Sequence, residues 1–198
     1  MNRVLVIYDF DLVLTSEDSF KNFIEWYSGE VKTTLTRALL SPISLVGSII
    51  GDEILWKDHM LGLHFEKMSE DEFYKICKRY ALVKLPEIII QDGVHSIKSH
   101  INDGDEVCVV SAGFAKYVEV YFNQLDVKVL GSSINCENEH PMMGLNCNYE
   151  EKLKVIIETY NIEEFEKIIV YGKSPETDNL MSIASERFYQ PFEPEYPD

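Results

Sequence analysis

The sequence has few basic residues for its acidic content. Its 198 residues include 18 lysines and arginines against 34 aspartates and glutamates, which gives a formal net charge of −16 at pH 7. A surface of this sign repels nucleic-acid phosphates and anionic lipid, so we expect neither nucleic acid nor membrane as a partner. An anionic substrate would therefore need a local cation, supplied by a metal ion or by lysines.

The sequence also lacks paired cysteines and a secretory leader. Its four cysteines are Cys77, Cys108, Cys136 and Cys147, and none has the C-x-x-C spacing of zinc or redox motifs. The amino terminus runs directly into a predicted strand with charged residues beside it, which is unlike a signal peptide. We therefore expect a reducing, cytoplasmic location.

No uninterrupted apolar run is long enough for a membrane helix, which needs roughly 20 residues. The most apolar stretch, residues 35–56, is broken by charged residues, glycines and a proline. Two interpretations of this stretch remain: it packs within a helical bundle, which we favour, or it docks a partner. The sequence leaves the oligomeric state open.

Strands and helices alternate along most of the chain. Aliphatic runs of four or five residues predict strands that are buried on both faces, as in parallel sheets. The alternation predicts an α/β fold with a doubly wound parallel sheet. Residues 16–89 instead carry only helical patterns, so we expect residues 1–15 and 90–198 to form the core and 16–89 a helical cap. The predicted strands cover residues 4–7, 106–110, 127–131 and 167–171.

Polar side chains follow three of these strands. Asp9 and Asp11 come after the first, Ser111 after the second, and the loop 172–178 after the last, while Lys152 opens a helix between the last two. The carboxyl ends of parallel strands share one edge, where open α/β sheets bind ligands. A carboxylate nucleophile, a hydroxyl for phosphate, a lysine and a further carboxylate suit phosphoryl transfer.

On these residues the chain resembles the haloacid dehalogenase superfamily of phosphohydrolases, in its phosphoserine-phosphatase-like subgroup with a helical cap. The run Asp9-Phe10-Asp11-Leu12-Val13-Leu14-Thr15 matches the first family motif, although Leu12 stands where glycine is common. The resemblance implies that Asp9 is the nucleophile and a metal ligand. It implies that Asp11 is the general acid and base, with its backbone carbonyl also on the metal.

The second and third motifs are matched further along the chain. The run Val110-Ser111-Ala112-Gly113 implies that Ser111, Ala112 and Gly113 bind phosphate, with main-chain N–H groups at a helix start. The run that ends at Lys152 implies that this lysine braces Asp9 and the phosphate, although Lys154 is a neighbouring candidate. The implied activity is hydrolysis of a small phosphorylated metabolite through an aspartyl-phosphate, with Mg²⁺ as cofactor.

The fourth motif departs from the family pattern. Asp178 matches its second acid, a metal ligand, but Lys173 stands where the first acid is expected. An ammonium group has no acceptor for Mg²⁺. Three outcomes follow: Glu176 or Asp178 supplies the missing ligand, the Lys173 ammonium replaces the metal in a degenerate, ligand-binding or regulatory protein, or Lys173 points outward and the metal binds poorly.

Overall fold

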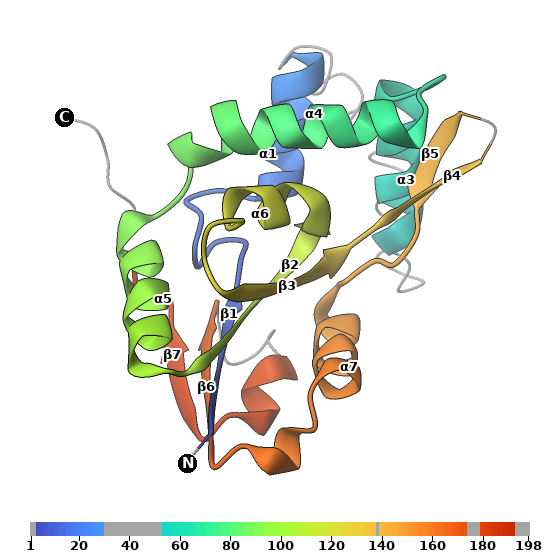
Figure 1. Ribbon diagram of the computed structural model, residues 1–198. Helices are drawn as coiled ribbons and strands as arrows, with labels where there is room; N and C mark the ends of the chain where they lie inside the picture. Colours follow the sequence, from blue (N-terminus) through green and yellow to red (C-terminus); the bar gives the residue numbers. More distant parts are fainter. Residues whose placement is uncertain (1–2, 30–52, 138, 174–178, 193–198) are drawn as a thin grey trace.

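The computed structural model describes residues 3–29, 53–137, 139–173 and 179–192, and it contains a five-stranded parallel sheet (Figure 1). The strand order is β3-β2-β1-β6-β7, with β1 at the centre, and every pairing is parallel. The sheet strands are β1 (Val4–Asp9), β2 (Glu106–Phe114), β3 (Val127–Ser132), β6 (Lys167–Gly172) and β7 (Glu186–Tyr189).

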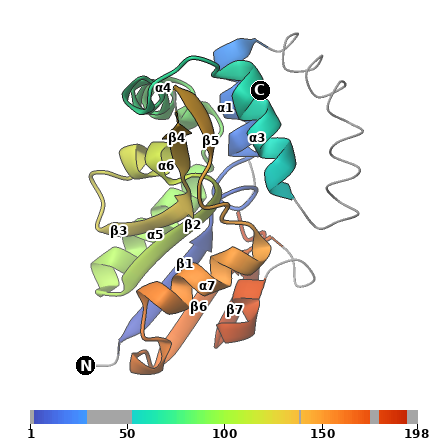
Figure 2. The same cartoon turned by 90° about the vertical axis from the view of Figure 1, so that its right-hand side faces the viewer.

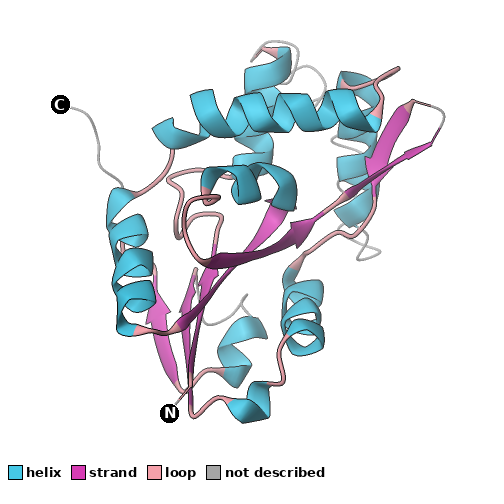
Figure 3. Cartoon of the chain, in the orientation of Figure 1, coloured by secondary structure: helices cyan, strands magenta, loops and turns pink. Residues whose placement is uncertain are grey.

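The central strand is aliphatic because both of its faces are covered. Val6 and Tyr8 belong to one buried hydrophobic cluster and Leu5 and Ile7 to another on the opposite face. Helices α5 (Gln91–Asp103) and α6 (Ala115–Tyr121) contribute to the first cluster, and α7 (Tyr149–Thr159) to the second. Figure 3 shows helices on both sides of the strands, which confirms the predicted α/β class.

Helices α1 (Ser19–Ser28), α3 (Glu53–His64) and α4 (Glu70–Val83) lie beyond the carboxyl ends of the central strands (Figure 2). Capping residues fix the amino-terminal ends of two of these helices. Asp18 caps α1 by accepting the Lys21 N–H, and Ser69 and Glu72 form a reciprocal capping box at the start of α4. Inside this helical layer, Phe23 packs against several other aromatic rings, including that of Phe114 in the core.

Two elements that the sequence did not specify lie at the margins of the sheet. Strand β7 is exposed along its whole length, so it carries no buried apolar pattern. The hairpin formed by β4 (Ile134–Glu137) and β5 (His140–Met143) reaches from the core to α3, where the Asp58 carboxylate accepts the Met143 N–H. Nothing in the sequence indicates this contact with α3.

Several boundaries differ from those predicted. Strand β2 continues to Phe114, beyond its predicted end at residue 110, so Ser111 to Gly113 lie in an irregular strand end that leads into α6 at Ala115. A short 3-10 helix, η3 (Asn179–Ile183), precedes β7. Most of the apolar stretch 35–56 lies outside the described residues. In the described ranges, no helix has the length and apolar character needed to span a bilayer.

Candidate active site

A buried ion pair joins the end of β1 to the first turn of α7. The Lys152 Nζ donates to Asp9 Oδ1 at 2.6 Å, and both side chains are about 6–7% exposed. Asn148 caps α7, and the Lys152 N–H bonds to its carbonyl, so the helix start fixes where the lysine side chain begins. Charges this deeply buried are tolerated only when they are paired, so each group holds the other in its ionised form.

The second carboxylate is held by hydrogen bonds from two elements. Asp11 Oδ2 accepts the Ser111 hydroxyl at 3.0 Å, and Asp11 Oδ1 accepts the Ser19 N–H at 2.8 Å. The Ser111 Oγ in turn accepts the Gly113 N–H at 2.9 Å. The structure therefore brings Asp9, Asp11, Ser111 and Lys152 together at one edge of the sheet.

A tight turn carries the chain from Asp9 into the helical layer. Leu12 has φ of 64°, a left-handed conformation that favours glycine, and its N–H is donated to the Thr15 hydroxyl at 3.1 Å. The Thr15 hydroxyl also bonds to the Glu17 carbonyl at 2.7 Å. Leu12 thus adopts the left-handed backbone conformation that glycine would adopt with less strain.

Two residues that sequence reasoning missed border this site. The Lys57 Nζ, on α3, donates to the Ala112 carbonyl and to Asn146 Oδ1, both at 2.9 Å. The pKa of the Asp18 carboxyl is raised by loss of hydration and then by the charge of Asp11, while Lys57 opposes the shift. A single lysine within a helix carries no local signal of this contact, which joins residues 55 positions apart.

Only the first residues of the fourth motif belong to the part of the chain that the structure describes. Glu176 and Asp178 lie outside the described residues. Lys173 is half-buried, and within the described part of the chain it forms no ion pair with Asp9 or Asp11. Likewise, no cluster of three or more metal-ligating side chains occurs among the described residues. The oxygen donors of Asp9 and Asp11 nevertheless suit Mg²⁺, which binds through one or two carboxylates together with phosphate and water.

Replacing Gly113 by alanine should damage the site directly. An added Cβ would lie 1.9 Å from the Tyr117 Oη and 2.7 Å from the Ser19 Oγ, so strand β2 or both hydroxyls must shift. We expect turnover at this site to fall by about 10²-fold, because misplacing a reacting group by about 1 Å has that effect. Steady-state kinetics would test this, with Gly62→Ala, which meets nothing within 4 Å, as the control. Equal activities would contradict it.

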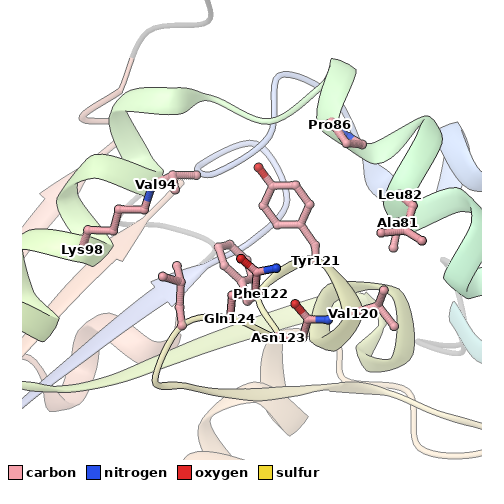
Figure 4. Close-up of a pocket in the computed structure, with 11 residues that line it drawn as sticks. Ala81, Leu82, Pro86, Val94, Lys98, Val120, Tyr121, Phe122, Asn123 and Gln124 are labelled. Atoms are coloured by element: carbon pink, nitrogen blue, oxygen red, sulfur yellow. The ribbon is translucent and has the colours of Figure 1, made fainter.

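A separate cavity of about 340 Å³ lies away from these carboxylates, where α4, α5 and α6 approach one another (Figure 4). Its lining includes Leu82, Lys98 and Tyr121, and none of the predicted site residues belongs to it. The candidate active site is therefore the strand-end cluster and not this cavity.

No protein-family model and no curated protein sequence matches the chain. Solved structures do match its fold. A protein of unknown function from Bordetella pertussis Tohama I has 15% identity and a TM-score of 0.75, covering 96% of this chain and 90% of its own. A phosphoserine phosphohydrolase-like protein from Francisella tularensis subsp. tularensis SCHU S4 has 15% identity and a TM-score of 0.65, covering 96% and 87%.

A phospho-aspartyl intermediate analogue of phosphoserine phosphatase is similar at 16% identity and a TM-score of 0.63, covering 96% of this chain and 87% of that one. A cytosolic 5′-nucleotidase bound to cytidine matches at 16% identity and a TM-score of 0.60, covering 94% and 71%. The chain therefore shares the fold of the phosphoserine phosphatase structures.

Proposed function

We propose that this chain, built on the haloacid dehalogenase fold, hydrolyses a small phosphomonoester through a phosphoryl group carried on Asp9. Two hydrogen-bonded pairs carry the proposal: Lys152 with Asp9, and Ser111 with Asp11, all at the carboxyl edge of the sheet. Fold similarity to phosphoserine phosphatases supports it. Hydrolysis of small phosphorylated substrates is the activity to which this set of side chains is best suited.

In the proposed reaction, Asp9 attacks the phosphorus and the bond to the leaving oxygen breaks. Lys152 holds the Asp9 carboxylate and offsets the charge of the phosphoryl oxygens. Ser111 donates its hydroxyl to a phosphoryl oxygen, and Asp11 gives a proton to the leaving alcohol. Water then attacks the phosphorus of the acyl phosphate, Asp11 takes its proton, and the free Asp9 carboxylate returns with inorganic phosphate.

We propose Mg²⁺ as the cofactor, held by the Asp9 carboxylate, the Asp11 backbone carbonyl and Asp178. When bound, Mg²⁺ would offset negative charge on the nucleophile and the phosphate. Support comes from the carboxylate of Asp9, whose Oδ1 accepts the Lys152 ammonium, and from the oxygen donors of Asp11, which are the ligand type that Mg²⁺ prefers.

We also propose that residues 16–89 form a cap over a core of residues 1–15 and 90–198. The two chain crossings lie side by side, because Thr15 pairs with Ile89 and the Ser16 N–H bonds to the Ile88 carbonyl. Lys57 and Asp18 reach the site from this cap, so they are the residues we expect to contact the part of the substrate beyond the phosphate.

Hydrolysis of p-nitrophenyl phosphate with and without Mg²⁺ tests the proposal. The wild type should turn over only with Mg²⁺. Lys173→Asp should lower the Mg²⁺ concentration for half-maximal activity by about tenfold, because a carboxylate replaces a repelling charge near the metal. Lys167→Asp, at the far end of the same strand, is the control. No turnover by the wild type but turnover by Lys173→Asp would instead establish a degenerate site.

A further inference from the structure

A fully buried pair of hydroxyls lies directly behind Asp11. The Ser19 Oγ and the Tyr117 Oη are 2.9 Å apart, and both residues are completely buried. Ser19 is the first residue of α1, and Tyr117 lies on α6, 98 positions further along the chain. The backbone N–H of the same Ser19 donates to Asp11 Oδ1 at 2.8 Å. Ser19 therefore contacts Tyr117 with its side chain and Asp11 with its main chain.

A second tyrosine holds the same residue from α4. The single Tyr80 O–H proton is shared between two acceptors, Asn22 Oδ1 at 2.9 Å on the next turn of α1 and the Ser19 carbonyl oxygen at 3.3 Å. The rings of Tyr80 and Tyr117 meet edge to face at 5.1 Å between centroids. Burial raises the pKa of both phenols, so both stay neutral hydroxyls able to hydrogen-bond at any working pH.

These contacts fix one residue from three directions. The Ser19 hydroxyl, carbonyl and N–H all have partners, and the partners lie on α6, on α4 and in the turn after β1. The glycine at position 113 is what makes room, since a Cβ there would overlap the Tyr117 Oη. A buried hydroxyl pair with no other role would usually be replaced by apolar packing at little cost in stability.

We infer that Tyr117 is a positioning residue for Asp11, acting through Ser19 to hold the start of α1 against the Asp11 carboxylate. The inference rests on the proposed function, because it assigns Asp11 to proton transfer. Its consequence is that the proton-transfer group is aligned only while α1 is docked on α6. Loss of the Tyr117 hydroxyl lets the Ser19 N–H leave Asp11 Oδ1. The carboxylate then loses one of the two hydrogen bonds that fix its orientation.

Hydrogen exchange of the Ser19 amide tests this without any need for turnover. In Tyr117→Phe the Ser19 amide proton should exchange about tenfold faster than in the wild type. The variant lacks the hydrogen bond between the Tyr117 and Ser19 hydroxyls that keeps the Ser19 N–H on Asp11. The Val109 amide, in the buried strand β2, reports global unfolding, and its exchange should increase by less than that of the Ser19 amide. Tyr121→Phe, on the same helix but lining the separate cavity, is the control and should match the wild type. Unchanged exchange at Ser19 in Tyr117→Phe would overturn the inference.

Kinetics then separate positioning from packing. Tyr117→Phe should lower kcat by about tenfold while KM changes less than about twofold, because the substrate is still bound but the proton is poorly placed. Ser19→Ala keeps the backbone N–H but removes the hydroxyl, and should give the same loss. The double variant should be no worse than either single one, because the two hydroxyls act as one unit. Additive losses would contradict action through Ser19.

The two hypotheses fail in different ways. If the wild type proves inactive but the Ser19 amide responds to Tyr117→Phe, the positioning contact stands and the proposed function falls. If the wild type is active but neither exchange nor kcat responds, only the positioning role falls. Should Tyr117→Phe not fold, Ser19→Ala carries both measurements.

Discussion

Asp9→Asn is expected to lower kcat by about 10⁴-fold or more, since removing a nucleophile has losses of this order. The amide has nearly the same shape, and its oxygen can still accept the Lys152 hydrogen bond that Asp9 Oδ1 accepts now. The fold should therefore survive while the phosphoryl acceptor is lost. Initial rates with p-nitrophenyl phosphate would measure the change.

Asp126→Asn is the matched control for this variant. Asp126 is exposed just before the amino end of β3, whereas the site lies at the carboxyl ends of the strands, and its substitution should leave kcat within about twofold of the wild type. Circular dichroism should show both variants folded. If Asp9→Asn kept a tenth or more of the wild-type rate, Asp9 could not be the nucleophile.

Lys152→Met should be costly for both stability and activity. It leaves the Asp9 carboxylate buried without its ion-pair partner, and breaking a buried pair on one side costs about 3–5 kcal/mol of unfolding free energy. The loss of a cation at the phosphoryl group should also lower kcat by about 10²-fold. Urea unfolding and steady-state kinetics measure the two effects.

Lys154→Met provides the comparison within the same helix. Lys154 pairs with Glu151 at the surface, where ion pairs contribute about 0.5 kcal/mol or less. We therefore expect nearly wild-type stability and activity for this variant. Similar losses in both variants would show that the buried position of Lys152 has no special role.

Much of this architecture is predictable from the sequence because burial leaves a pattern. The run from Val4 to Ile7 lies at the centre of a parallel sheet, so both of its faces must be apolar. Local signals also mark helix ends: the capping box of Ser69 and Glu72 starts α4, and Gly29 caps the end of α1. Strand β7 is four exposed residues at a sheet edge, and nothing in its composition distinguishes it from a loop.

The residues of the candidate site also fall into a predictable and an unpredictable group. Asp9, Asp11, Ser111 and Lys152 follow predictable strands or open a predictable helix, so topology alone suggests that they meet. Long-range contacts made by single side chains leave no such pattern. The contact of Lys57 with Ala112 and that of Tyr117 with Ser19 each depend on how the helical layer packs against the core. The predicted phosphate contacts of Ser111, Ala112 and Gly113 through main-chain N–H groups stay a prediction; in the structure the Gly113 N–H is donated to the Ser111 Oγ.

Trapping the phosphorylated enzyme tests the central claim most directly. The wild type would be quenched in acid during turnover of p-nitrophenyl phosphate with Mg²⁺, digested, and its peptides analysed by mass spectrometry. We predict one added phosphoryl group on the peptide that contains Asp9, absent in Asp9→Asn and removed by hydroxylamine, which cleaves acyl phosphates. Turnover with an unmodified Asp9 peptide, or with the phosphoryl group on another residue, would contradict the account.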